Sequence, residues 1–101
     1  GGLQKVNHLV ARVDEQDVVS LTWERGESLP SAGEGDELVV VVLYADRSFS
    51  PEYIKTGGET RGNGKATFRL QRKRGSTAHL YCFFREKNGK AYSPSQYVEI
   101  L

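Results

Sequence analysis

Apolar and polar residues alternate with a period of two along most of the chain, which is the spacing of the two faces of a β-strand. In residues 7–13 the apolar side chains of Leu9, Ala11 and Val13 share one face. The polar residues 14–17 follow and are typical of a solvated turn. The pattern therefore predicts a first strand that reverses into a second.

The second segment, residues 18–23, contains the clearest prediction of a buried face. Val19, Leu21 and Trp23 alternate with hydroxyl-bearing residues, so the only tryptophan shares a face with two aliphatic side chains. We expect this face to lie in the core, where truncation of the indole would cost about 3–5 kcal/mol. Residues 24–37 are rich in glycine and acidic residues and predict a loop.

Two further segments are apolar at consecutive positions. Residues 38–45 are rich in β-branched side chains and predict a central strand that is covered on both faces. Residues 78–84 predict another such strand, with Leu80, Cys82 and Phe84 on one face. The first of these strands, residues 38–45, is expected to lie in the middle of a sheet.

Weaker signals indicate the remaining elements. Residues 65–70 alternate and predict a strand. Residues 50–55 have two interpretations, because Ser50 and Pro51 could begin a helical turn whereas residues 53–55 could form an edge strand.

The end of the chain predicts a hairpin. Asn88-Gly89 is the signal of a two-residue hairpin turn. The last strand is expected over residues 92–100, with an edge or a bulge at Pro94, which has no N–H to donate.

About seven short strands separated by turn signals predict an all-β fold, a two-layer antiparallel β-sandwich. A partly closed barrel is the alternative. The length of 101 residues suits one domain over residues 1–101, and the paired glycines in place of a starting methionine suggest a tag remnant or a fragment of a longer chain. The longest apolar run, residues 38–45, is too short for a membrane span, and the sequence does not indicate a cellular location.

The pattern Val19-x-Leu21-x-Trp23, together with Tyr81-x-Phe83 on a later strand, resembles fibronectin type III and related immunoglobulin-like domains. A closer resemblance rests on the order of several motifs over about four fifths of the chain. These motifs are Val19-x-Leu21-x-Trp23, Gly35-Asp36 before residues 38–44, Arg61-x-x-Gly64, residues 80–84, Asn88-Gly89-Lys90 and Ser93-x-Ser95-x-Tyr97. In this order they are similar to the C-terminal β-sandwich domain of an uncharacterised bacterial family whose members are typically about twice as long. The resemblance implies a β-sandwich without a known enzymatic activity.

The charges balance overall but are unevenly distributed. Fourteen basic and thirteen acidic residues give a net charge of +1, which favours neither a nucleic-acid nor a membrane partner. Residues 1–50 carry four basic and nine acidic side chains, whereas residues 51–101 carry ten and four. The two sets either cancel across neighbouring strands or form a dipolar surface.

The chain lacks the patterns of a catalytic or metal site. His8 and His79 are far apart, with no cysteine or acidic residue at a ligand spacing, so we expect no metal and no cofactor. Cys82 lies in an apolar strand, three residues from His79, and these positions point to opposite faces. We therefore expect that the protein is not an enzyme.

Two groups of residues are candidates for binding. The basic cluster Arg69, Arg72, Lys73 and Arg74 could contact an acidic polymer, or could simply keep a β-edge soluble. Aromatic residues expected to be partly exposed could bind sugar rings if two or three were coplanar, and they are Tyr44, Phe49, Tyr53, Tyr92 and Tyr97.

The function expected from these observations is that of a non-catalytic interaction or structural module whose partner is a protein, either another domain or a subunit. The alternative is a ligand-binding module for a carbohydrate or an acidic polymer.

Overall fold

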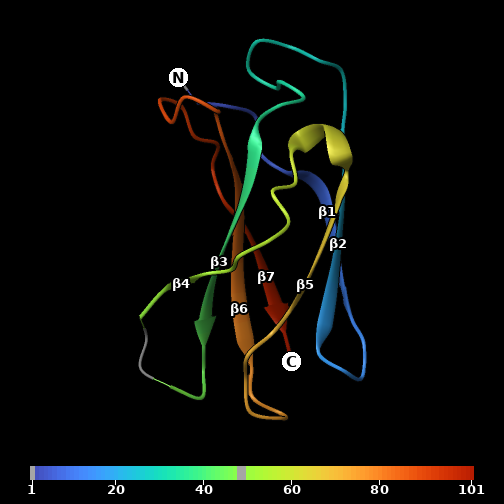
Figure 1. The fold of residues 1–101 in the computed structure, drawn as a ribbon, viewed down its shortest axis with the longest axis vertical. Coiled ribbons are helices and arrows are strands. Elements are labelled where there is room, and N and C mark those ends of the chain that lie inside the picture. The colour runs from blue at the N-terminus through green and yellow to red at the C-terminus, as the bar shows by residue number, and fades with distance from the viewer. Residues whose placement is uncertain (1, 48–49) are drawn as a thin grey trace.

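The computed structural model describes residues 2–47 and 50–101 and is an antiparallel β-sandwich (Figure 1). The three-stranded sheet has the order β1-β2-β5 and the four-stranded sheet the order β4-β3-β6-β7. The all-β, two-layer prediction is confirmed. The strands are β1 Asn7–Val13, β2 Val18–Glu24, β3 Glu37–Tyr44, β4 Glu52–Tyr53, β5 Lys65–Arg69, β6 Ala78–Arg85 and β7 Gln96–Ile100.

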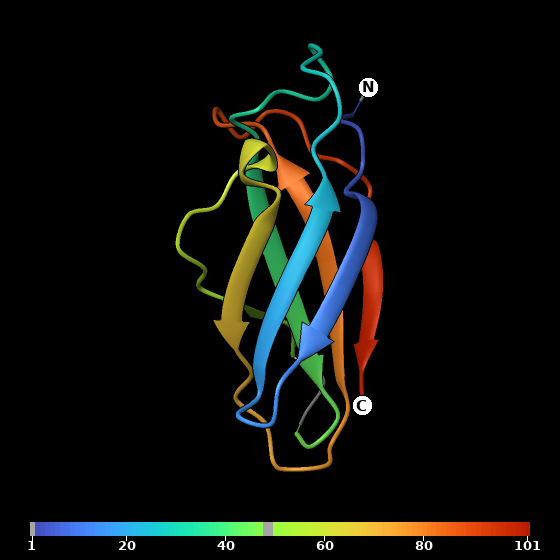
Figure 2. The same ribbon diagram turned by 90° about the vertical axis from the view of Figure 1, so that its right-hand side faces the viewer.

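The two sheets pack face to face, and Figure 2 shows the three-stranded sheet in front of the other. At one side of the sandwich the edge strands β1 and β7 lie next to each other. The chain enters near one end of the long axis, which measures 41 Å, and Leu101 lies toward the other end. Within residues 2–47 and 50–101, no helix is long and apolar enough to cross a membrane.

The core forms between the inner faces of β2, β3, β5 and β6. Val19, Leu21 and Trp23 of β2 are buried, as predicted. The indole of Trp23 meets the ring of Phe84 edge-on, with centroids 5.9 Å apart and planes at 71°. This arrangement is one of the favoured geometries of aromatic pairs. The lone tryptophan is therefore central to the contact between the two sheets.

Segments outside the strands also enter the core. Leu3 and Val6, which precede β1, are buried, and the sequence pattern did not indicate this. A short 3-10 helix, η1 Arg61–Asn63, leads into β5 and ends at Gly64, whose φ of 71° is the left-handed conformation that glycine adopts readily.

The prediction that the 38–45 strand is covered on both faces was only half right. On its inner face Val40 and Val42 are buried, whereas on its outer face Val39 is buried but Val41 and Leu43 are only half-buried. A sandwich has two layers, so a central strand has one layer packed against it and one face toward solvent. Apolar residues on the outer face need another explanation.

The structure decides the alternatives at residues 50–55. Glu52 and Tyr53 form the edge strand β4, which pairs with Val42 and Val41 of β3. The edge-strand interpretation is therefore correct.

The last strand is shorter than predicted, because pairing is interrupted near Pro94. Tyr92 makes an isolated bridge to Arg85, and β7 begins only at Gln96. At the interruption the buried Ser93 supplies the missing acceptor, since the backbone N–H of Phe84 donates to its Oγ at 2.9 Å.

The predicted two-residue hairpin at Asn88-Gly89 is wrong in its length. The backbone N–H of Glu86 donates to the carbonyl of Ala91, so four residues form the loop. Gly89 has a φ of 74°, whereas Asn88 is not among the positive-φ residues. A two-residue type I′ turn needs both central residues at positive φ, so this turn belongs to a longer class.

Candidate functional site

The outer face of the three-stranded sheet is polar. Its cross-strand neighbours include Arg12 beside Ser20, Ser20 beside Thr67, and Thr22 beside Lys65. All of these side chains are exposed, and the same face carries two large apolar residues, the exposed Val10 and the half-buried Val18. This face has the composition of an ordinary solvated sheet surface.

The outer face of the four-stranded sheet has the opposite character. The register places Val39 beside Phe83, and Val41 between Tyr53 and Tyr81. Tyr81 also lies beside Tyr97 of β7. We call this surface the aromatic face and define it by Val39, Val41, Leu43, Tyr53, Tyr81, Phe83, Tyr92 and Tyr97.

Three tyrosines of the aromatic face are at least half exposed, namely Tyr53 at 75%, Tyr92 at 51% and Tyr97 at 50%. Tyr44, which sequence reasoning grouped with them, is buried, and its hydroxyl accepts the backbone N–H of Gln71 at 2.9 Å. Phe49 lies outside the described residues. The exposure expected of Tyr44 was therefore wrong, because this residue belongs to the inner face of β3.

The rings of the aromatic face do not form one flat platform. Tyr81 and Tyr97 are 5.3 Å apart at an angle of 43°, and Phe83 and Tyr92 are 6.2 Å apart at 54°. The near-parallel pair is His79 on Tyr97, at 17°, and these two rings stack on each other. The coplanar arrangement that would favour sugar binding is not present among these pairs.

Polar groups lie around the aromatic face. The Tyr97 hydroxyl is 2.6 Å from Nδ1 of His79 and 3.4 Å from Oε2 of Glu99. Partial burial of the phenol and the nearby Glu99 carboxylate raise the pKa of Tyr97. At the other end, Arg85 and Glu37 form an ion pair at 3.4 Å.

The basic cluster is divided by the fold. The side chain of Arg72 is only 6% exposed, and its Nε and Nη2 donate to both carboxylate oxygens of Asp17 at 3.1 and 3.0 Å. Arg72 also donates to the backbone carbonyls of Ile100 and Leu101. Arg69, Lys73 and Arg74 are exposed, but Arg69 projects from the polar face of β5 whereas the other two lie in the turn beyond it. Arg72 is thus a structural residue.

Part of the uneven charge of the sequence is paired in space. Three ion pairs join an acidic residue of the first half to an arginine of the second half, and they are Asp17–Arg72, Asp36–Arg61 and Glu37–Arg85. The sequence left open whether the opposite charges cancel across neighbouring strands or form a dipolar surface. In these three pairs the opposite charges cancel.

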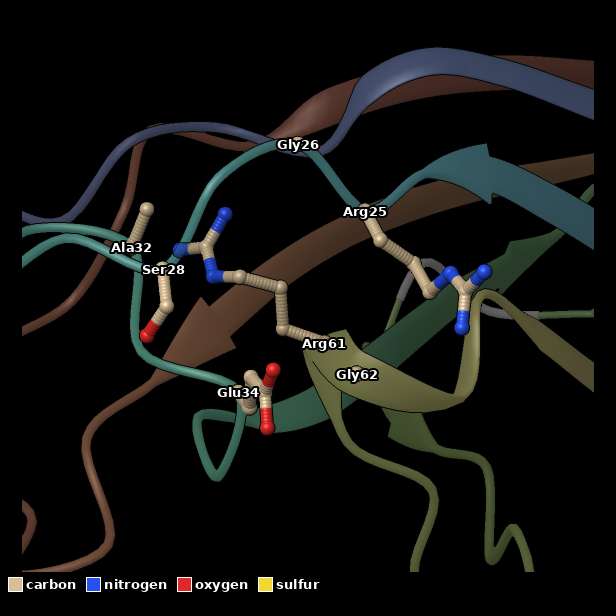
Figure 3. A pocket seen from close by; sticks show the side chains of 7 residues that line it. All are labelled: Arg25, Gly26, Ser28, Ala32, Glu34, Arg61 and Gly62. Atoms are coloured by element: carbon tan, nitrogen blue, oxygen red, sulfur yellow. The ribbon is translucent and has the colours of Figure 1, made fainter.

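A hollow of about 470 Å³ lies between the loop that follows β2 and the helix η1 (Figure 3). Arg61 extends from η1 toward Ser28, whereas Arg25 points away from it. The Arg61 guanidinium is already bonded, since its Nε donates to Asp36 at 3.0 Å and its Nη2 to the carbonyl of Gln4 at 2.8 Å. The hollow therefore lies beside a structural contact.

Arg61 has two further contacts that connect η1 to the core. Its guanidinium lies 4.1 Å from the centroid of the Phe84 ring, a cation–π geometry. Its backbone carbonyl accepts the indole N–H of Trp23 at 2.9 Å. Sequence reasoning quoted Arg61 within the Arg61-x-x-Gly64 motif and as a neighbour of the basic cluster, and it did not predict the burial of this residue.

The remaining candidates for chemistry lie apart. Cys82 is fully buried, and burial raises the pKa of its thiol to about 12. His79 lies on the other side of the sheet, as its strand position predicted. In residues 2–47 and 50–101 no three histidine, cysteine or acidic side chains gather in a way that could hold a metal ion.

A comparison with protein-family models finds none that matches this chain, and a comparison with curated proteins finds no significant match.

Proposed function

We propose that the chain is a non-catalytic interaction module of fibronectin type III-like layout that binds another protein through the aromatic face. The observation that carries the proposal is the contrast between the two outer faces. One is polar, and the other presents three tyrosines that are at least half exposed around an aliphatic centre. Burial of the core does not account for the aromatic face, because the two sheets are already packed on their other sides.

The strand order supports the fibronectin type III-like assignment. A constant-type immunoglobulin sandwich has four strands in the sheet that contains the first strand and three in the other. Here the numbers are reversed, because the fourth strand pairs with β3 and not with the sheet of β1 and β2. The resemblance to the bacterial family stays a prediction.

The chemistry of the aromatic face favours a protein partner. Tyrosine and phenylalanine are enriched at the centres of protein interfaces, where they bury large areas at low entropic cost. The surrounding polar groups include charges of both signs, with Glu37 beside Arg85, and Glu99 beside His79. A partner surface with an uncharged apolar centre and a mixed polar border would fit this face.

Site-specific photo-crosslinking in cells that produce the protein tests the proposal. A photoreactive residue in place of Tyr92 should capture one defined protein, whereas the same residue in place of Ser20 on the polar face should not. Tyr97→Lys should abolish the captured product and Thr22→Lys, its matched control, should leave it. Equal capture from both faces, or capture that survives Tyr97→Lys, would contradict the proposal.

The alternative of an acidic polymer has support from the exposure of Arg69, Lys73 and Arg74. Salt-dependent retention on heparin that is lost when these three residues are changed to serine would favour it. Arg72 should be left unchanged in this experiment, because its loss would disturb the fold.

A further inference from the structure

The strand β5 has a free edge whose backbone groups can be identified from the ladder. At its two ends, the N–H of Trp23 donates to the carbonyl of Gly64, and the N–H of Leu70 donates to that of Asp17. Because bonding direction alternates along an antiparallel strand, the even-numbered residues of β5 face β2. The backbone N–H and carbonyl groups of the odd-numbered residues therefore point away from β2, toward the free edge. These residues are Lys65, Thr67 and Arg69. In the described part of the chain no strand pairs with that side.

Two hollows follow one another along this edge. The first, about 520 Å³, lies between Gly57 to Glu59 and residues 65–67. The second, about 340 Å³, lies between β4 and residues 68–71, with Tyr44 and Phe68 among its lining residues. In Figure 2 the segment that leads from β4 to η1 bows outward beyond β5. In the described residues no strand pairs with β5 on this side, whereas β1 and β7 lie together on the opposite side.

Glu59 lines the first hollow, and one of its carboxylate oxygens lacks a partner. Oε2 of Glu59 is buried without a hydrogen bond in the described structure. A buried acceptor of this kind is costly, and a donor brought by a ligand would satisfy it.

We propose that the free edge of β5 binds an extended acidic segment of a partner chain by strand addition. The backbone groups of Lys65, Thr67 and Arg69 would pair with the added strand, as in other cases of β-augmentation. This site is separate from the aromatic face, and the proposal does not depend on the function proposed above.

Charge complementarity selects the occupant. The side chains of Lys65 and Arg69 are exposed on the face of β5 that the added strand would extend. Antiparallel pairing with a second copy about Thr67 would place Lys65 opposite Arg69 of that copy, and like charges at paired positions are destabilising. Acidic side chains at these positions are favourable instead, so in this register the edge disfavours its own copy and suits an acidic strand.

The inward positions of the added strand follow from the hollows. A side chain opposite Phe68 would enter the second hollow and should be apolar. A side chain opposite Ala66 would enter the first hollow, where a donor would meet Glu59. A blocked synthetic peptide with the central sequence Glu-Val-Thr-Lys-Glu meets these requirements when it runs antiparallel to β5.

Amide hydrogen exchange with this peptide tests the proposal. The peptide should slow exchange at Lys65, Thr67 and Arg69, while the amides of Ala66 and Phe68, already bonded to β2, should not change. Thr67→Pro should weaken binding by about tenfold or more, because proline removes the central donor and is tolerated where a strand's N–H faces solvent. Unchanged exchange at the three amides at saturating peptide would overturn the proposal.

A second variant keeps the test decisive if Thr67→Pro does not fold. Exchanging both Lys65 and Arg69 for glutamate should weaken binding of the acidic peptide. The same variant should bind more tightly a peptide that has lysine in place of the two glutamates. Tyr97→Lys on the aromatic face should leave peptide binding unchanged, so failure here and failure of the proposed function are distinguishable. Equal binding of both peptides to the wild-type protein would contradict the choice of an acidic occupant.

Discussion

Arg61 and Asp36 form an ion pair inside the sandwich, with Nε of Arg61 3.0 Å from Oδ2 of Asp36 and both residues less than a tenth exposed. The two backbones are bonded as well, because the N–H of Arg61 donates to the carbonyl of Asp36 at 2.8 Å. Through Gln4, Trp23 and Phe84, Arg61 also contacts the N-terminal segment and both sheets. This pair therefore joins segments that are far apart in the sequence.

Removing one member of the pair should be strongly destabilising. Asp36→Ala leaves the Arg61 guanidinium buried without its counter-charge, and we expect the free energy of unfolding to fall by about 3–5 kcal/mol. Urea denaturation followed by tryptophan fluorescence measures this change. Glu37→Gln, at the more exposed pair with Arg85, should cost less than about 1 kcal/mol. Similar losses in the two variants would show that the buried pair has no special role.

The hydroxyl of Ser93 should contribute to the free energy of unfolding. Ser93→Ala leaves the buried N–H of Phe84 without an acceptor, and we expect a loss of about 1–3 kcal/mol. Ser95→Ala, at an exposed position on the same connection, is the matched control and should change the unfolding free energy by less than about 0.5 kcal/mol. Equal effects would mean that the Phe84 amide finds another partner.

The pair of Asp17 and Arg72 predicts part of the acid sensitivity. Hydrogen bonds from Arg72 hold the pKa of Asp17 below its ordinary value of 3.8, although burial acts in the opposite direction. Because the folded-state pKa is lower than the unfolded-state pKa, the contribution to stability is fully present above the unfolded-state pKa and is lost as pH falls through the folded-state pKa. Asp17→Asn should lower stability at neutral pH and make its decline below about pH 4 less steep. Unfolding free energies at neutral and acidic pH measure both effects, and parallel curves for the two proteins would contradict the prediction.

Cys82 should be unreactive in the folded protein. Burial raises the pKa of its thiol to about 12, so the nucleophilic thiolate is scarce at neutral pH and reagents lack access. We expect a thiol reagent such as Ellman's reagent to react slowly in native buffer and rapidly in concentrated guanidinium. Rapid reaction under native conditions would show that β6 opens readily or that the thiol is accessible.

The strands could be predicted because alternation is a local property of the chain. Val19, Leu21 and Trp23 fall on one face whatever packs against them, and the structure buries all three. The outer face of β3 could not be predicted in the same way. Val41 and Leu43 are as apolar as their buried neighbours, and only the packing of the layers decides which face stays open.

The charged contacts could not be predicted from the sequence for a related reason. Charged residues are almost never fully buried unless they are paired, and the partner of Arg61 lies 25 positions away. Arg72 belongs to a basic run that looks like a surface patch, yet Asp17, 55 positions earlier, bonds to it and withdraws it from solvent. Neither separation has a local sequence signal.

The positions of the chain ends have a mechanical consequence. The chain enters toward one end of the long axis and leaves toward the other, so a pulling force applied to its ends would act nearly along the strands. Ladder hydrogen bonds run across the strands, and such a force would load many of them simultaneously in shear. Single-molecule extension should therefore require a higher rupture force when the protein is held by its ends than when it is held across neighbouring strands.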